Sequence, residues 1–287
     1  MVHDGGRPPP GAAHQNSEVP PTSTQSPTPT DVIATLRSAG CVFAEDEARL
    51  LLDAARDGAQ LTTMVQERVS GRPLEQILGW AEFCGLRVAV EPGVFVPRRR
   101  TEFLVRQAAA LLATDEAVVV DLCCGSGAVA AALASASRSI VLHASDIDPV
   151  AARCAERNLA PGAVHCGDLY DALPADLRGR VDLLVVNAPY VPSDAIATMP
   201  PEARLHEPHG ALDGGADGVD VHRRVAAGAP EWLAPGGHLL IETSEHQADL
   251  TAEACARAGL APRPIHCPEL GATVVVAAAP GAGSGPA

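Results

Sequence analysis

The fold is decided by residues 117–133, which read AVVVDLCCGSGAVAAAL. The apolar run from Ala117 to Asp121 is typical of a buried strand, and the alanine-rich run from Ala128 to Leu133 is typical of a helix. The turn Cys123–Gly127 lies between them. Its glycines allow a ligand to approach the backbone closely, and the helix N-terminus offers unpaired N–H groups. Taken alone, this pattern also fits a tight turn that simply requires glycine.

Strand and helix patterns alternate regularly along the chain from residue 98 to residue 279. A helical pattern runs to Leu112, and apolar runs predict strands at 117–122, 139–146, 163–167, 181–187, 238–243 and 273–278. Helical patterns fill most of the gaps between these strands. This order is typical of a doubly wound, mostly parallel α/β sheet.

The segments before this domain have different compositions. Residues 1–30 contain seven prolines and hardly a large apolar side chain, so we expect a disordered tail there, and another at 280–287. Residues 31–79 show helical periodicity and predict a small helical domain, which either docks a partner or caps the larger domain. Apolar and polar residues alternate over residues 80–97, on both sides of Glu91-Pro92-Gly93. This pattern predicts a β-hairpin linker with its turn at those three residues.

Composition and charge restrict the class of protein. The chain has 287 residues, and 35 acidic against 21 basic residues give a formal charge of −14, which disfavours a nonspecific nucleic-acid binder. The eight cysteines form no C-x-x-C pair and no zinc-type cluster, so we expect reduced thiols, no metal site and a cytoplasmic location. The vicinal Cys123 and Cys124 would be redox-sensitive if exposed. No segment resembles a signal peptide or a membrane span.

Three acidic residues follow predicted strands. Asp146 lies 19 residues after Gly127, close to the roughly 20 expected for a carboxylate that accepts both hydroxyls of a ribose. With the glycine turn, it predicts a nucleoside-containing ligand. Asp148 is expected to cap a helix that begins near Pro149. Asp168 either faces the same crevice or caps a helix.

The fourth predicted strand ends in Asn187-Ala188-Pro189-Tyr190, at the sheet edge where ligands of such folds bind. The Asn187 side-chain oxygen and the Ala188 carbonyl can both accept hydrogen bonds from one planar NH₂ group, with Tyr190 over its face. The segment therefore suits a neutral amide or amine. In isolation the same residues would also fit an ordinary turn.

Over residues 31–279 the chain resembles the PrmC/HemK family, the glutamine methyltransferases of peptide-chain release factors. The matching text occurs in order: Arg72-Pro73-Leu74, Ile77-Leu78-Gly79, Pro97-Arg98, Thr101-Glu102, Asp121-Leu122, Gly125-Ser126-Gly127, Asp146, Asn187 to Tyr190, His206-Glu207-Pro208, Ala211 to Gly215, Asp217-Gly218 and Pro235-Gly236-Gly237. The resemblance implies a Rossmann-like methyltransferase with a seven-stranded sheet and S-adenosylmethionine (SAM) as its methyl donor.

The resemblance also implies roles for individual residues. Asp121 belongs to the cofactor site, Cys123, Cys124, Gly125, Ser126 and Gly127 cradle the methionine part, Asp146 binds the ribose, Asp168 and Leu169 meet the adenine, and Thr101 helps with the methionine carboxylate. Asn187, Ala188, Pro189 and Tyr190 form the catalytic segment that orients a glutamine side-chain amide, and Asn187 also belongs to the cofactor site. The implied substrate is the Gly-Gly-Gln loop of a release factor, docked by residues 31–79, and we expect a monomer.

Two departures from the family text bear on the substrate. Ala188 replaces the first proline of Asn-Pro-Pro-Tyr, which keeps the backbone carbonyl but loses the fixed φ angle. Arg99 and Arg100 replace the middle residues of Pro-Arg-Pro-Glu-Thr-Glu. A paralogue that methylates another protein therefore remains open.

Other interpretations of the same residues differ in class. The four-residue motif also suits an adenine exocyclic amine in DNA or RNA, with the arginine triplet in its favour and the net charge against it. A nicotinamide-dependent oxidoreductase would leave Asn187 and Tyr190 without a role, and a non-catalytic SAM-binding module would not need them. His206 and Glu207 are expected to anchor a Pro-rich loop. Asp213, Asp217 and Asp220 are expected to form turns and cap a helix from Val219, because the terminal glutamate of a calcium loop is missing.

Overall fold

A computed structural model of the chain describes residues 1, 27–112, 116–137 and 139–281. Most of the two predicted tails, 1–30 and 280–287, therefore lies outside the described residues. The first helix begins two residues inside the predicted N-terminal tail. This helix, α1 (Pro29–Ser38), starts with a capping box, because Thr28 accepts a hydrogen bond from Asp31 N and the Asp31 carboxylate accepts one from Thr28 N.

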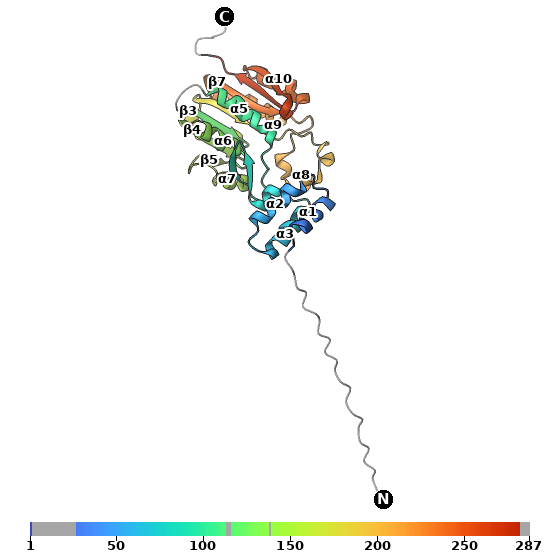
Figure 1. Cartoon of the computed structure of the whole chain (residues 1–287). Coiled ribbons are helices and arrows are strands. Elements are labelled where there is room, and N and C mark those ends of the chain that lie inside the picture. The colour runs from blue at the N-terminus through green and yellow to red at the C-terminus, as the bar shows by residue number, and fades with distance from the viewer. Residues whose placement is uncertain (2–26, 113–115, 138, 282–287) are drawn as a thin grey trace.

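The helical structure predicted for residues 31–79 is present as four helices. They are α1, α2 (Ala44–Ala54), α3 (Gly58–Val69) and α4 (Leu74–Leu78). Their inward side chains form a hydrophobic core of their own around Leu36, Leu51 and Leu61. Figure 1 shows this helical segment at one end of the molecule, beside α8 (Pro201–His206), with the C-terminal strands at the opposite end.

The hairpin that follows has its turn at a different place from the predicted one. Strands β1 (Trp80–Phe83) and β2 (Leu86–Ala89) pair antiparallel, and the turn between them is Cys84-Gly85, both with positive φ, as a two-residue hairpin turn requires. Residues 91–93 do form a turn, in which Val94 N donates to Glu91 O at 3.1 Å and Gly93 has a φ of 82°, but this turn does not join the two strands of the hairpin as predicted. Residues 94–96 belong to no strand, and side chains bond to their backbone: Val94 O accepts from Gln76 and Val96 N donates to Glu207.

The main sheet has seven strands in the order β5-β4-β3-β6-β7-β9-β8. The pairs from β5 to β7 in this order are parallel, and β9 pairs antiparallel with both of its neighbours, β7 and β8. The strands are β3 (Ala117–Leu122), β4 (Ile140–Asp146), β5 (Val164–Cys166), β6 (Val181–Val186), β7 (Leu233–Thr243), β8 (Ala261–Cys267) and β9 (Ala272–Ala278). The doubly wound, mostly parallel architecture is thus confirmed.

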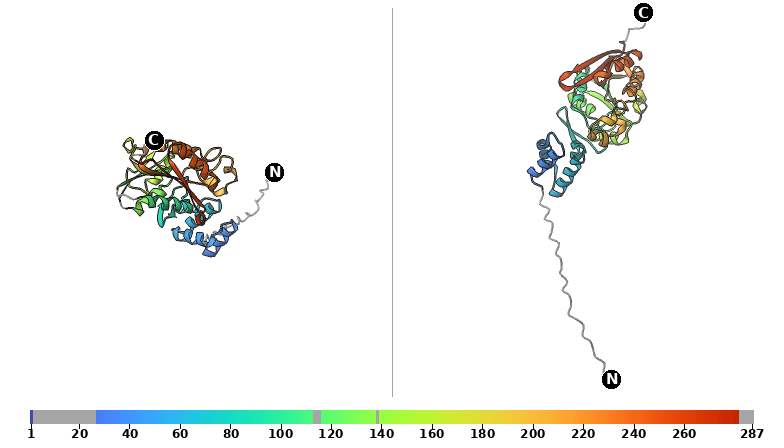
Figure 2. Two further views of the ribbon diagram at one scale, coloured as in Figure 1. Left: turned by 90° about the horizontal axis from the view of Figure 1, so that it is seen from above. Right: turned by 90° about the vertical axis from the view of Figure 1, so that its right-hand side faces the viewer.

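Helices cover both faces of this sheet, as Figures 1 and 2 show. On one face lie α5 (Glu102–Leu111), α6 (Ala128–Ala136) and α7 (Pro149–Ala155), and on the other α9 (Asp220–Trp232) and α10 (Ala248–Arg257). Successive strand residues point to opposite faces, so Val119 packs under α5 and α6 while Val118 and Val120 pack under α9. Burial on both faces explains why these strands read as continuous apolar runs.

Two strands differ from the sequence-based expectation. Strand β8 was not predicted, since Pro262 and Pro264 interrupt the apolar pattern and proline is confined to the edges of sheets. Strand β7 starts at Leu233 rather than at 238, because it includes Pro235-Gly236-Gly237 with a shift of register against β6. Both strands lie toward the antiparallel side of the sheet.

The register of the four central strands sets the position of the candidate site. Ser145, Leu122, Val186 and Ile241 pair across β4, β3, β6 and β7. The next residue of each chain segment is therefore at the carboxyl edge of the sheet, and these residues are Asp146, Cys123, Asn187 and Glu242. Within the described part of the chain, no helix has the length and apolar character needed to cross a membrane.

Candidate active site

A cavity of about 790 Å³ opens at this carboxyl edge. It is bounded by the ends of β3, β4 and β6, by residues of the segment 93–101, and by residues of the segment 199–212. All predicted site residues except Gly127 line it: Thr101, Asp121, Cys123, Cys124, Gly125, Ser126, Asp146, Asp168, Leu169, Asn187, Ala188, Pro189 and Tyr190. The fold therefore brings together side chains that are separated by up to 89 residues in the sequence, from Thr101 to Tyr190.

The turn between β3 and α6 has three left-handed residues, Cys123, Gly125 and Gly127. A Cβ on Gly127 would lie 3.1 Å from side-chain carbons of Ala155 and Leu159, so this glycine serves both the backbone angle and the packing of α6 on α7. A Cβ on Gly125 would meet no atom within 4 Å. Gly125 thus exposes its backbone to the cavity, while Gly127 lies behind the cavity wall.

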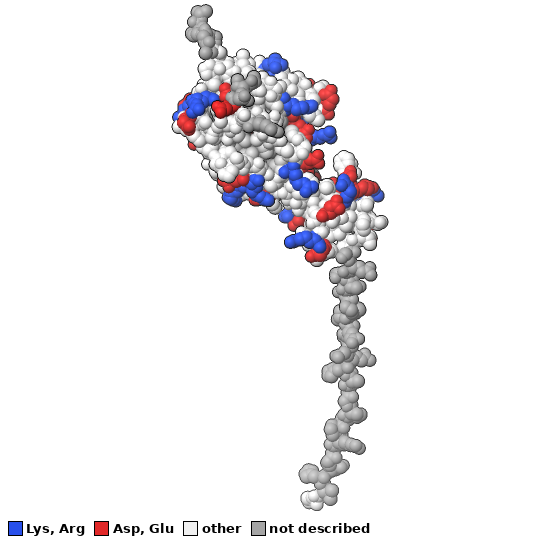
Figure 3. Space-filling view, turned by 60° about the vertical axis from the view of Figure 1, so that its left-hand side comes forward, with Lys and Arg blue, Asp and Glu red and all other residues white. Residues whose placement is uncertain are grey.

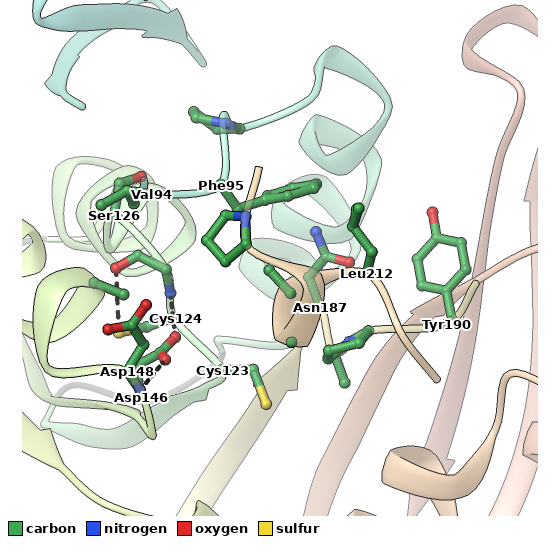
Figure 4. Close-up of a pocket in the computed structure, with 18 of the residues that line it drawn as sticks. Val94, Phe95, Cys123, Cys124, Ser126, Asp146, Asp148, Asn187, Tyr190 and Leu212 are labelled. Carbon is green, nitrogen blue, oxygen red and sulfur yellow. Dashed lines mark hydrogen bonds between the residues drawn. The ribbon is translucent and has the colours of Figure 1, made fainter. Parts of the chain in front are cut away.

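The Asp146 carboxylate is anchored by two backbone N–H groups. Its Oδ2 accepts from Gly125 N at 2.8 Å and its Oδ1 from Asp148 N at 2.9 Å. Burial raises the pKa of Asp146, and these hydrogen bonds oppose the rise. Each oxygen keeps a further lone pair, so the carboxylate can still accept from a ligand in the cavity (Figure 4). Asp148 caps α7, as expected, by accepting from Val150 N.

Asp121, at the end of β3, holds the helix that follows the turn. Its Oδ2 accepts from Ala130 N at 3.1 Å, and its side chain is almost fully buried. Burial raises the pKa of Asp121 to about 8. The carboxyl group therefore fixes the first turn of α6 relative to β3 in addition to lining the cavity.

Asp168 and Leu169 also line the cavity. Asp168 precedes a short 3-10 helix but makes no capping bond with its side chain; instead its Oδ2 accepts from Arg224 of α9 at 2.7 Å. Leu169 is buried with a φ of 46°, and its carbonyl accepts from the Ser145 hydroxyl. Of the two roles left open for Asp168, the structure shows the one that faces the crevice.

Asn187 lies directly after β6, on the opposite wall from Asp146 (Figure 4). Its Nδ2 donates to Thr101 Oγ1 at 3.4 Å, which leaves Oδ1 without a hydrogen bond among the described residues. Ala188 is buried, with 2% of its surface exposed. Thr101, which was expected near the methionine carboxylate, is thus in contact with the candidate catalytic asparagine.

Tyr190 is held by three side chains. Its hydroxyl donates to Glu242 Oε1 at 3.3 Å, the Arg100 guanidinium lies 5.8 Å from its ring centre, and the His222 ring packs against it at 6.3 Å. Burial raises the pKa of Tyr190, and it lowers the pKa of His222 to about 4. Both rings are therefore neutral near pH 7, and the Tyr190 ring is a fixed apolar wall.

The backbone at Tyr190 is enclosed by the glycine-rich loop 213–218. A Cβ on Gly214 would lie 2.7 Å from Tyr190 Cα, and a Cβ on Gly218 would collide with Tyr190 O. Gln247 Nε2 donates to the same carbonyl oxygen at 2.8 Å. Glycine is required here because no side chain fits between the loop and the catalytic segment.

Glu207 anchors the segment 96–98 through hydrogen bonds. Both carboxylate oxygens of Glu207 accept a hydrogen bond from Arg98 Nη2 at 2.6 Å, and Oε1 accepts another from Val96 N at 3.2 Å. The Glu207 side chain is fully buried. These bonds explain how Glu207 anchors its loop, as expected from the sequence. His206 was expected in a loop but is the last residue of α8, where it contacts Ser70 O of the helical segment.

The acidic residues of the glycine-rich loop form turns. Asp213 accepts from Gly215 N and Ser193, and Asp217 accepts from Val219 N and Arg223. Asp220 is the first residue of α9, which therefore begins one residue later than expected, and no side chain caps it. Among the described residues no group of three His, Cys, Asp or Glu could hold a metal ion.

Sequence reasoning missed Glu242, Gln247 and Arg224. Glu242 is an acidic residue at the end of a predicted strand, which is the same signal that identified Asp146. Gln247 and Arg224 act on residues 57 and 56 positions away. No local pattern identifies such partners.

The vicinal cysteines do not form a reactive pair. Cys123 and Cys124 are free thiols, as are the other six cysteines of the chain. Burial raises the pKa of both thiols, and the carboxylates of Asp146 and Asp121 raise them further. The two cysteines therefore serve as small side chains of the cavity wall.

The chain is similar to known methyltransferases. A family model described as "Methyltransferase small domain" matches residues 85–215. A release factor glutamine methyltransferase of Geobacter sulfurreducens is 38% identical over 200 residues, which cover 68% of this chain and 69% of the relative. A 4-amino-L-phenylalanine/4-methylamino-L-phenylalanine methyltransferase of Streptomyces pristinaespiralis is 40% identical over 191 residues, which cover 64% of this chain and 65% of the relative.

A solved structure has the same fold. A methyltransferase from Pyrococcus furiosus superposes with a TM-score of 0.52 at 15% sequence identity, covering 69% of this chain and 90% of that one. At this identity the likeness concerns the architecture only.

Burial of the site thiols predicts the order in which the cysteines react. We expect iodoacetamide at mildly alkaline pH to modify the exposed Cys166 first, the half-buried Cys123 more slowly because its pKa is raised, and the buried Cys124 only after unfolding. Peptide mass spectrometry of samples taken over time would measure the order. A Cys166→Ser variant should lose the fast phase, and modification of Cys123 as fast as Cys166 would contradict the prediction.

Proposed function

The chain belongs to the release factor glutamine methyltransferase family, and we propose that it transfers a methyl group from SAM to the side-chain amide nitrogen of a glutamine in a peptide-chain release factor. One observation carries this proposal: Asn187 and Ala188 directly follow the central strand β6, in the same row as Asp146 and Cys123. An amide-binding segment thereby adjoins a nucleoside-type site.

The residues of the cavity fit SAM. The Gly125 backbone is open toward the cavity, and Asp146 has lone pairs left for two hydroxyls. We propose that Cys123–Gly127 with Asp121 hold the methionine part, Asp146 the ribose, and Asp168 with Leu169 the adenine. When bound, SAM supplies an electrophilic methyl group on its sulfonium sulfur.

The acceptor nitrogen needs orientation, because the lone pair of an amide is delocalised into its carbonyl. We propose that Asn187 Oδ1 and the Ala188 carbonyl accept the two N–H groups and stabilise the positive charge that grows on the nitrogen. The bond from Asn187 Nδ2 to Thr101 supports this role, because it directs Nδ2 away and leaves Oδ1 available. Tyr190, immobilised by Glu242 and Gln247, would cover the planar amide.

The helical segment 31–79 is proposed to dock the protein substrate, and residues 98–279 to form the methyltransferase domain. The apolar side chains of Val42 and Phe43 are 83% and 68% exposed between α1 and α2. The segment is joined to the domain near the cavity, since Arg68 lies 3.7 Å from Glu202 of α8 and Gln76 bonds Val94 O. The free thiols support a reducing compartment, and we propose a cytoplasmic monomer.

A second candidate function is methylation of an aromatic amine on a free amino acid. The Streptomyces relative, whose name states such a substrate, is about as similar to this chain as the Geobacter relative. A nucleic-acid amine is less well supported, because the net charge is −14 and charges of both signs are interspersed over the surface drawn in Figure 3.

The role of Asp146 is tested by Asp146→Ala. We expect SAM affinity to fall at least tenfold, because two charge-assisted hydrogen bonds of about 1.5–3 kcal/mol each are lost. Isothermal titration calorimetry would measure the affinity, with the exposed Asp194→Ala as a control that binds normally. Unchanged affinity in Asp146→Ala would refute the assignment.

The role of Asn187 is tested by Asn187→Ala. Transfer to a release factor should slow about 100- to 1,000-fold in single-turnover assays, while SAM affinity stays close to that of the wild type. Mass spectrometry should place the methyl group on a glutamine amide in the wild-type reaction. Methylated adenine without methylated protein, or a rate within a few-fold of wild type, would count against the proposal.

The docking role is tested by Val42→Asp with Phe43→Asp. The double variant should raise KM for the intact release factor about tenfold without changing kcat/KM for a short glutamine peptide, because only the folded substrate reaches the helical segment. Val141→Asp on β4 introduces a charge at another exposed apolar site and is the matched control. An equal loss with both substrates would argue against docking there.

A further inference from the structure

Arg100 lies at the rim of the cavity, next to the candidate catalytic segment. It belongs to the 3-10 turn Arg99–Thr101 that precedes α5, it lines the cavity, and its side chain is 45% exposed. Its Nε lies 3.4 Å from Glu242 Oε1, and the guanidinium also interacts with the Tyr190 side chain. Its two Nη groups make no hydrogen bond within the described part of the chain.

The Glu242 carboxylate holds Arg100 in place. Its side chain is 2% exposed, and its Oε1 accepts from both Arg100 and the Tyr190 hydroxyl. Its Oε2 is buried without a hydrogen bond among the described residues. A guanidinium fixed on one edge and stacked beside an aromatic ring loses little further entropy when its other edge binds a ligand.

The segment 98–100 carries an excess of positive charge. Arg98 is neutralised by Glu207, and Arg100 has a single long contact with Glu242, but no ion pair involves Arg99 within the described residues. Three arginines against two carboxylates leave a net charge of +1. Compared with the family segment Pro-Arg-Pro-Glu-Thr-Glu, Arg99 in place of proline and Arg100 in place of glutamate raise the formal charge by three. Glu202, also on the cavity wall, lies 3.7 Å from Arg68.

We propose that Arg100 is a specificity residue that binds a carboxylate of the acceptor beside the nitrogen to be methylated. The proposal rests on the proposed function of the same site. A guanidinium presents two parallel N–H groups that match a carboxylate. The carboxylate belongs to an acidic side chain next to the glutamine of a protein, or to the α-carboxylate of a free amino acid.

The test compares two acceptor peptides that differ by one group. Each contains one glutamine, preceded in one peptide by aspartate and in the other by asparagine, and binding to the full chain is measured by fluorescence anisotropy. We expect the aspartate peptide to bind about tenfold more tightly at low salt, and the preference to shrink as salt is added. Equal affinity for the two peptides, together with equal affinity for 4-amino-L-phenylalanine and its carboxamide, would overturn the proposal.

Variants assign the preference to Arg100. Arg100→Gln should abolish it, Arg100→Lys should keep part of it, and Arg106→Gln, an exposed arginine of α5, should leave it unchanged. Because Arg100→Gln leaves the Glu242 carboxylate unpaired, the double variant with Glu242→Gln is measured as well, and it should also lack the preference. A preference that persists in both variants would refute the role of Arg100.

The outcome separates this proposal from the proposed function. A carboxylate preference that depends on Arg100, without any methylated glutamine, supports the specificity role and refutes glutamine transfer. Equal methylation of both peptides supports glutamine transfer and refutes a specificity role of Arg100 toward an acidic side chain of a protein. A parallel comparison of 4-amino-L-phenylalanine with its carboxamide identifies the source of the carboxylate: a preference confined to this pair assigns it to a free amino acid, and one confined to the peptides assigns it to a protein.

Discussion

The parallel pairing of β6 between β3 and β7 is the constraint on which the site depends. It aligns Leu122, Val186 and Ile241 across the sheet, and thereby places Cys123, Asn187 and Glu242 side by side at its carboxyl edge. A shift of one residue in either pairing would turn these side chains to the opposite face. The alternating apolar residues below them, buried on both faces, make such a shift costly. The hydrophobic core therefore determines the geometry of the polar site.

Around this row, the polar groups are held by partners from distant segments. Glu207 and Glu242 are buried carboxylates, and each is paired with an arginine of the segment 98–100 that lines the cavity. An unpaired buried carboxylate would be costly, so each pair also fixes this segment. The loop 213–218 packs its glycines against Tyr190 from the other side. The substrate-facing wall is thus assembled from four segments that meet only in the folded protein.

The sequence was sufficient for features that depend on local patterns. Apolar runs on both sides of the glycine turn located six of the seven strands, and the strand-end positions of Asp146 and Asn187 followed from them. The hairpin turn was misplaced because Pro92-Gly93 is a stronger turn signal than Cys84-Gly85, although the pairing of β1 with β2 selects the latter. Partners such as Arg98 and Glu207 lie 109 residues apart, and local patterns carry no information about such contacts.

The two prolines of β8 have a consequence for self-association. Pro262 and Pro264 are two residues apart, so their missing N–H donors lie on the same side of the strand, and the continuous ladder with β9 identifies this side as the free edge. At the opposite edge, β5 has only three residues. Neither border of the sheet therefore offers a long row of unpaired donors that a strand of another molecule could extend, which protects the exposed ends of the sheet against edge-to-edge aggregation.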